Sequence, residues 1–395
     1  MLLEQKFHLP DEILSKFKQN KNLVDLKLKT EESIDTITSN CKLEYYQEEL
    51  DLVEKISAKI SLQYSKAIII AIGGSMSSSQ AFTACKNYQS NNFTLTYSNS
   101  LAIDKQEAVF TKENLQNSAI IIISRSGESA EILNQVYNIT NKYKQFFGPN
   151  YALGDHFYII TQGPNFLTDF GSNIRANIFN YISKSGKFST FSLVGLLPAR
   201  LIGLLPKEII LSALQVLKFP QNAIDAAYIN YELLNLKYNI NILLHYNDLL
   251  EKTLLRQAQT ASEIIAKDNR GFTPLVTGIS DQHGLWQLFL TGPSDKYFTL
   301  LRTKKSDYDP ELNYLIEDTY YKLNLKSLKR KSIPIRELII DKIDSASLGA
   351  LSMHLLLETI LLANIMNVSS TTHPDIDKNK KLLSKIFLTK LKNIF

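Results

Sequence analysis

The sequence has few of the features that mark secreted, membrane-bound or disordered proteins. Its 395 residues include only two cysteines, Cys41 and Cys85, which cannot form a disulfide framework and favour a reducing compartment. No apolar run reaches the roughly 18 residues of a membrane span. The nearest runs, FSLVGLLPARLIGLL and LLLETILLANIM, contain Pro198 and Glu358. The first residues, MLLEQKFHLPDE, lack the basic start and apolar run of a signal peptide. We therefore expect a cytoplasmic protein without a membrane segment.

Charge of one sign does not dominate the chain either. The formal net charge is +5, with 21% charged and 44% hydrophobic residues, which is typical of a globular protein. Two basic stretches occur, at 326–336 and 377–392, and the second has the apolar spacing of an amphipathic C-terminal helix. We expect no nucleic-acid and no membrane partner. A mildly basic surface suits an anionic metabolite instead.

Short apolar runs bounded by turn residues divide the chain into two α/β blocks. They lie at 66–75, 92–99, 119–127 and 156–164 in the first block, and at 239–246, 296–303 and 334–341 in the second. Helix-length sequence separates the runs, which favours βαβ units and parallel sheets buried on both faces. Residues 1–60 have a polar, helical pattern without a strong strand signal.

The length of the chain also favours two domains over one. We predict an N-terminal helical segment, two α/β domains and a C-terminal helix, at residues 1–60, 61–205, 206–375 and 376–395.

Three hydroxyl side chains and a glycine follow one of the predicted strands. In the segment SRSGES, Ser124, Ser126 and Ser129 precede a helical pattern, and Gly127 allows close approach of the backbone. The first N–H groups of a helix lack partners within it and carry partial positive charge, so anions bind there. Three hydroxyls match the three peripheral oxygens of a phosphate monoester.

A second glycine turn, IGGS at 72–75, ends another strand of the same block. Because ligands of open α/β sheets bind along the edge where parallel strands end, Gly74 and Ser75 should lie beside the serines. Either motif alone is also typical of a plain helix cap, but together they favour a phosphate site. The sequence contains neither GxGxxG nor GxxxxGK[ST], which argues against NAD and ATP.

Four segments, in order along the chain, resemble the glucose-6-phosphate isomerase family. IGGS and ISRSGESAE are similar to its sugar-isomerase (SIS) domain, and SGKFSTFSLVGLLPA resembles its signature G-G-R-[FY]-S-x-x-S-x-x-G. The segment 259–299, with its D-Q-H triplet, resembles the catalytic segment, and 343–368 resembles a late helix. The resemblance runs from about residue 66 to 380 and matches compact bacterial members.

The resemblance implies a fold and an activity. The fold is α/β, with two three-layer αβα sandwich domains that have parallel sheets of the flavodoxin-like type. The activity is the reversible isomerisation of glucose 6-phosphate and fructose 6-phosphate through a cis-enediol, in glycolysis and gluconeogenesis. It uses neither metal nor cofactor. Ser124, Ser126 and Ser129 would hold the phosphate, beside the turn of Gly74 and Ser75.

The resemblance also assigns the groups that move protons. Glu263 matches the base that transfers a proton between C1 and C2, a task that suits a carboxylate whose pKa burial has raised. Gln259 lies four residues earlier, so on a helix it shares the face of Glu263. His283 matches a histidine that opens the sugar ring in the neighbouring subunit's site, which implies a homodimer. Lys380 matches a lysine that assists ring opening.

Two positions depart from the family pattern. Lys187 replaces the signature arginine that faces the developing enediolate, so a single mobile ammonium stands in for a planar two-pronged donor. A lost donor of this kind costs about 3 kcal/mol of barrier, on the order of a hundredfold in rate. His373 stands where a substrate-binding glutamine is expected, seven positions before Lys380.

Two alternatives remain open at this point. The same site could act on a broader set of phosphosugars, such as mannose 6-phosphate. The chain could also be a phosphosugar-binding protein whose catalysis is weakened by Lys187 and His373. Against the second alternative, the sequence retains Gln259, Glu263 and His283 and has no basic DNA-recognition helix before residue 60.

Overall fold

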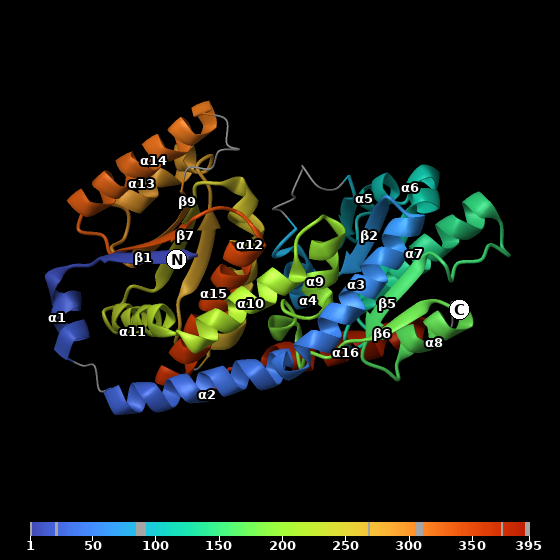
Figure 1. Cartoon of the computed structure of the whole chain (residues 1–395), viewed down its shortest axis with the longest axis horizontal. Helices are drawn as coiled ribbons and strands as arrows, with labels where there is room; N and C mark the ends of the chain where they lie inside the picture. Colours follow the sequence, from blue (N-terminus) through green and yellow to red (C-terminus); the bar gives the residue numbers. More distant parts are fainter. Residues whose placement is uncertain are drawn as a thin grey trace. The chain divides into compact units, whose positions relative to one another are not determined.

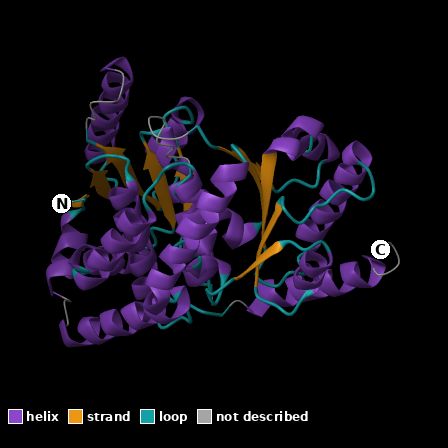
Figure 2. Ribbon diagram, turned by 45° about the vertical axis from the view of Figure 1, so that its right-hand side comes forward, coloured by secondary structure: helices purple, strands orange, loops and turns teal. Residues whose placement is uncertain are grey.

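The computed structural model describes residues 2–19, 23–83, 92–267, 269–304, 311–372 and 374–391 (Figure 1). The chain forms two compact units. One comprises Met1–Ser39 and Leu205–Thr372 and is called the glutamate unit because it contains Glu263. The other comprises Asn40–Leu204 and His373–Phe395 and is called the serine unit because it contains SRSGES. Each unit has a five-stranded sheet with helices packed on it, as expected for the α/β class (Figure 2).

The sheet of the serine unit is parallel throughout, in the order β3-β2-β4-β5-β6. Its strands are β2 (Lys66–Ala71), β3 (Thr94–Ser98), β4 (Ser118–Ile123), β5 (Phe157–Thr161) and β6 (Asn177–Asn180). The isoleucines of β2 and β4 are buried on both faces, because helices cover the sheet on each side. All four strands predicted in this block are confirmed.

Helices follow the strands of the serine unit as βαβ connections require. They are α3 (Tyr46–Gln63), α4 (Gly73–Gln80), α5 (Ile103–Val109), α6 (Lys112–Asn117), α7 (Ala130–Phe147), α8 (Phe166–Asn173), α9 (Leu193–Leu201) and α16 (Pro374–Leu391). The last of these, α16, is the C-terminal helix, and its Phe387 packs against the core beside α7. Its Leu382, Leu383 and Ile386 are about half exposed.

The sheet of the glutamate unit has the order β1-β10-β9-β7-β8. Its strands are β1 (Leu3–His8), β7 (Ile240–His245), β8 (Thr273–Thr277), β9 (Lys296–Thr303) and β10 (Ile335–Ile340). Its helices are α1 (Asp11–Gln19), α2 (Leu23–Cys41), α10 (Pro206–Lys218), α11 (Gln221–Asn235), α12 (Glu251–Ile265), α13 (Gln282–Thr291), α14 (Glu311–Arg330) and α15 (Ser345–Ile365). The three strands predicted here are confirmed.

The expectation that residues 1–60 contain no strand is wrong, because Leu3–His8 forms β1, antiparallel to β10 at the edge of the sheet. The strand is polar, and its side chains satisfy groups of the buried neighbour β10. Gln5 accepts a hydrogen bond from Arg336 Nε at 2.9 Å, and the His8 ring contacts the Glu337 carboxylate. Polar partners therefore fix this edge strand together with two apolar side chains, the buried Leu3 and Phe7, which packs against a core cluster.

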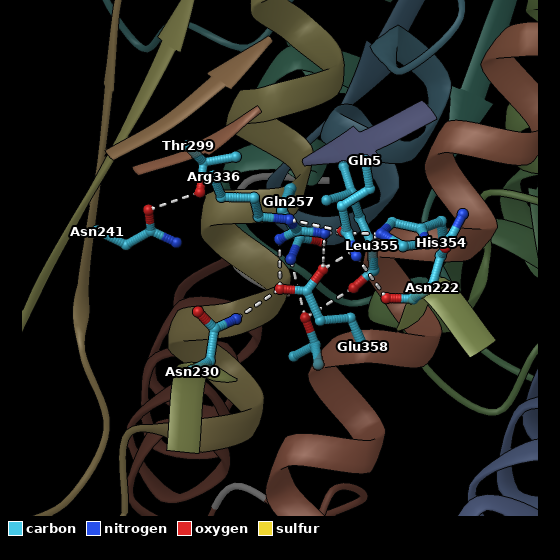
Figure 3. Close-up of polar contacts among 11 residues, drawn as sticks. Gln5, Asn222, Asn230, Asn241, Gln257, Thr299, Arg336, His354, Leu355 and Glu358 are labelled. Carbon is cyan, nitrogen blue, oxygen red and sulfur yellow. Dashed lines mark hydrogen bonds and ion pairs between the residues drawn. The ribbon is translucent and has the colours of Figure 1, made fainter. Parts of the chain in front are cut away.

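A buried ion pair joins β10 to α15 (Figure 3). Two guanidinium nitrogens of Arg336 each donate to one carboxylate oxygen of Glu358, both at 2.7 Å. Asn230 donates to the same carboxylate at 2.6 Å, and His354 Nε2 lies 2.6 Å from Arg336. Burial and the charge of Arg336 hold the pKa of His354 well below its usual value. A neutral His354 therefore accepts this hydrogen bond.

The same network explains the composition of α15. This helix is long and apolar enough to cross a membrane, but 89% of its apolar window is buried inside the unit. Its Glu358 is bonded to Arg336 in the core, so α15 is the central helix of a packed domain. Nothing in the described part of the chain suggests a membrane protein.

Candidate functional site

The glycine turn after β2 is packed directly against a second loop of the serine unit. A Cβ atom added to Gly74 would lie 2.8 Å from the carbonyl carbon of Gly186, and one added to Gly186 would lie 3.1 Å from Gly74 Cα. Gly186 belongs to the signature segment, in the loop that follows β6. Two segments more than a hundred residues apart in the sequence therefore meet at the carboxyl edge of the sheet.

Hydroxyl groups surround this contact. Ser75 Oγ lies 3.2 Å from the Tyr181 hydroxyl, and Ser78 Oγ donates to the Gly186 carbonyl at 3.2 Å. Ser189 Oγ donates to Ser78 Oγ at 3.0 Å. These bonds join the first turns of α4 to the loop at 181–189, so the predicted ligand turn is held in one conformation.

The SRSGES loop lies at the end of β4, next to β2 in the same sheet. Ser124 is buried, and its Oγ accepts the Gly127 N–H at 3.2 Å. Gly127 has a φ of +64°, and an added Cβ would overlap the side chain of Asn165. Ser126 Oγ accepts the Glu128 N–H at 3.4 Å. The loop is therefore a tight turn built by its own hydroxyls.

Ser129 is the N-cap residue of α7, but its side chain makes no capping hydrogen bond. The Ser129 hydroxyl is therefore not used by its own helix, which begins directly after the SRSGES loop at the end of β4. That is the arrangement in which a helix N-terminus favours an anion. The Arg125 guanidinium donates to the Lys184 carbonyl, which joins the serine loop to the loop at 181–189.

Lys187 is almost fully buried, with 1% of its surface exposed. Its Nζ lies 5.5 Å from the centre of the Phe188 ring, over which a cation is favourable. Lys187 directly follows Gly186, whose backbone packs against the glycine turn. The next helix, α9, begins against Glu49, which accepts the Leu193 N–H at 2.6 Å; burial raises the pKa of this carboxyl. Sequence reasoning missed Glu49, whose position on α3 gave no signal.

The glutamate unit holds the predicted base on α12. Gln259 donates to the Glu263 carboxylate at 2.8 Å, as expected for residues four apart on one helix face. Gln257, on the same helix, donates to Thr359 of α15 at 2.8 Å. Because Thr359 adjoins the buried Glu358, the helix that carries Glu263 is bonded to the core of its unit.

His283 is exposed in the first turn of α13. The segment before it is held by hydrogen bonds to Asp281. Asp281 accepts hydrogen bonds from Thr277 Oγ1 at 3.0 Å and from the Gly278 N–H at 2.9 Å. Gly278 in turn packs against the ring of His245, which is buried at the end of β7. Burial lowers the pKa of His245. Within the D-Q-H triplet, Asp281 therefore stabilises the turn between β8 and α13.

The remaining predicted residues are less informative. Lys380 is exposed on α16 in the serine unit, and His373 lies outside the described residues. The structure thus brings together Gly74, Ser75 and the loop of Lys187 in one unit, and Gln259 with Glu263 in the other.

Sequence reasoning also missed a pocket of about 310 Å³ at the ends of β5 and β6. It is lined by Lys42, Tyr45, Gln162, Asn180, Tyr181 and Ile182. Tyr181 connects it to the predicted turn through its hydrogen bond with Ser75. No group of three or more His, Cys, Asp or Glu side chains among the described residues could hold a metal ion.

Known proteins resemble the chain over most of its length, although no protein-family model matches it. It is 25% identical over 360 residues to glucose-6-phosphate isomerase from Methanocaldococcus jannaschii, covering 85% of this chain and 86% of that protein. It is 24% identical over 354 residues to glucose-6-phosphate isomerase from Campylobacter jejuni, covering 82% of this chain and 86% of that protein.

Two solved structures share the fold. A hypothetical protein from Thermus thermophilus has a TM-score of 0.81 at 18% identity, covering 96% of this chain and 99% of that one. A glucose-6-phosphate isomerase from Chlamydia trachomatis has a TM-score of 0.71 at 15% identity, covering 89% of this chain and 74% of that one. The chain is therefore a homologue of the glucose-6-phosphate isomerases, built from two α/β units with largely parallel sheets.

Proposed function

We propose that the protein is an aldose–ketose isomerase that interconverts glucose 6-phosphate and fructose 6-phosphate through a cis-enediol. The observation that carries the proposal is sequence similarity along more than four fifths of this chain and of relatives that bear this name. The reaction moves one proton between C1 and C2, and no electrons leave the sugar. It is an intramolecular oxidoreduction of a phosphosugar, in glycolysis and gluconeogenesis.

The serine unit would hold the phosphate. The N-terminus of α7 with Ser124, Ser126 and Ser129 supplies donors and partial positive charge, and the turn of Gly74 and Ser75 ends the neighbouring strand. Fixing the phosphate fixes the far end of the sugar. Orientation of this kind lowers the entropic part of the barrier for every later step.

The glutamate unit would supply the base. Glu263 takes the proton from one carbon and returns it to the other, and Gln259 fixes its orientation through the 2.8 Å hydrogen bond. Lys187, buried beside the glycine turn, would stabilise the negative charge of the enediolate. A lysine provides charge without the two-pronged geometry of an arginine, so we expect a slower enzyme than one with the family's signature.

Ring opening would require a proton carrier. We assign it to His283, with Lys380 assisting and His373 binding substrate. The exposure of His283 suits a side chain that reaches the site of a neighbouring subunit in a cytoplasmic homodimer.

Replacement of Glu263 by glutamine tests the assignment of the base. The amide keeps the size of the side chain but cannot accept the proton, so turnover of fructose 6-phosphate should fall by about 10²–10⁴-fold. Turnover is followed by coupling glucose 6-phosphate formation to its NADP-dependent oxidation. The matched control is Glu251→Gln in the first turn of the same helix, where the side chain is 44% exposed.

We expect the control to retain wild-type turnover. A Glu263→Gln protein as fast as wild type would remove Glu263 from the mechanism. A wild-type protein that converts neither sugar phosphate would overturn the proposed activity itself.

A further inference from the structure

The loop at 181–189 contains a hydroxyl that the fold of this loop does not use. Ser185 Oγ is shielded from solvent and has no hydrogen-bond partner in the described part of the chain. Ser185 is the N-cap of the short 3-10 helix Gly186–Phe188, a position where a serine side chain usually accepts a backbone N–H. Here it makes no such bond.

The backbone at this position does not require serine either. Ser185 has a φ of −157° and a ψ of 165°, an extended conformation that any residue adopts. Leaving a buried hydroxyl without a partner is unfavourable, and each such group calls for an explanation. Since neither the cap nor the backbone engages the Ser185 hydroxyl, this hydroxyl is available to bind a ligand.

The surroundings of Ser185 are those of the candidate site. Its neighbour Gly186 touches Gly74, and two positions later comes the buried Lys187. Ser185 as a whole is partly exposed although its Oγ is shielded, and the side chain has other staggered χ1 rotamers in which the hydroxyl points elsewhere.

We propose that Ser185 and Lys187 together present two donors to the sugar oxygen that becomes negatively charged during isomerisation. This rests on the proposed function. The signature that the segment resembles has Gly-Gly-Arg where this chain has Ser-Gly-Lys. A guanidinium provides two donors in a fixed fork, whereas an ammonium is a mobile point charge. The Ser185 hydroxyl supplies the second donor that the lysine lacks.

A double-mutant cycle tests the pairing. The variants are Ser185→Gly, Lys187→Arg and the double replacement, which restores the Gly-Gly-Arg sequence. We expect Ser185→Gly to lower kcat by about 10–100-fold in the wild-type background, as loss of one preorganised donor does. In the Lys187→Arg background the same change should cost no more than about threefold, because the guanidinium already provides both donors.

The matched control is Ser118→Ala. Ser118 also has a buried Oγ without a partner among the described residues, but it starts β4 at the opposite edge of the same sheet. We expect this variant to keep wild-type kcat. Melting temperatures of all variants confirm that each one folds.

Binding provides a second measurement that does not need turnover. Ser185→Gly should weaken the binding of a five-carbon phosphorylated hydroxamate, which imitates the enediolate, by at least about tenfold. It should weaken the binding of inorganic phosphate by less than about twofold. If Ser185→Gly lowers kcat equally with lysine and with arginine at position 187, or weakens the binding of both ligands equally, then Ser185 is structural and the inference is overturned. Absence of turnover in wild type, with the hydroxamate still bound through Ser185, would count against the proposed activity and not against the donor pair.

Discussion

Replacement of Glu358 by alanine should destabilise the glutamate unit strongly. The change removes both oxygens that bind the Arg336 guanidinium at 2.7 Å, and it leaves that guanidinium buried, with 4% of its side chain exposed (Figure 3). Breaking a buried ion pair from one side costs about 3–5 kcal/mol, because the remaining charge has neither water nor a counter-ion. The Asn230 amide loses its acceptor as well.

This cost is large beside the total stability of a domain, which is about 5–15 kcal/mol. For a domain of about 150–250 residues, each kcal/mol moves the melting temperature by about 2–4 °C, so we expect a shift of roughly 6–20 °C. Calorimetry and urea denaturation followed by circular dichroism measure it. The control is Glu54→Ala, which removes an exposed carboxylate that binds Arg200 Nε with both oxygens at 2.9 Å.

The exposed pair should contribute about 0–1 kcal/mol, since water screens and replaces it. A third variant, Arg336→Met with Glu358→Leu, removes both charges and should cost less than Glu358→Ala alone. If Glu358→Ala lowers the free energy of unfolding by no more than Glu54→Ala, the burial argument for this pair is refuted.

Three further predictions concern pH and packing. Because the pKa of His354 is held well below its usual value of about 6.5, only the unfolded chain binds this proton. The contribution of His354 to the free energy of unfolding should therefore be constant above about pH 6.5 and fall by up to about 1.4 kcal/mol per pH unit below it. Urea titrations should accordingly show a smaller dependence of stability on pH in His354→Asn than in wild type. Gly74→Ala should lower both stability and phosphate affinity, because its Cβ would lie 2.8 Å from the Gly186 backbone. Gly284→Ala, whose Cβ meets nothing within 4 Å on helix α13, should instead stabilise by up to about 1 kcal/mol in the same melts.

The strands that the sequence missed all lie at the edges of the sheets, whereas six of the seven that it predicted lie inside them. Runs such as KAIIIA and SAIIII form strands buried on both faces, where nearly every residue must be apolar. The three missed strands, β1, β6 and β8, are all edge strands. β8 contains Pro274, which lowers a strand signal but is tolerated at an edge. Edge strands need few apolar residues, so their sequences resemble loops.

The candidate site could be predicted only in part, for a similar reason. A hydroxyl-rich turn after an apolar strand is visible in the sequence, so Ser124, Ser126 and Ser129 were proposed as phosphate ligands from local pattern, and this assignment stays a prediction. The approach of the loop at 181–189 to the turn at 73–75 is a tertiary contact between distant segments, and no local pattern encodes it. Ser185 lies in that loop and stood out only when its hydroxyl was found without a partner.

The glycines of the two predicted ligand turns have a structural role, whereas sequence reasoning explained them by the approach of a ligand. From sequence, bare backbone at Gly74 and Gly127 suggests close approach of an anion. In the structure, Gly74 faces Gly186, and Gly127 faces Asn165 in a left-handed conformation, so side chains are excluded by loop–loop packing. This packing fixes the backbone of both predicted ligand turns at the end of the sheet. Preorganised donors of this kind need little rearrangement when charge develops, which is how such donors contribute to catalysis.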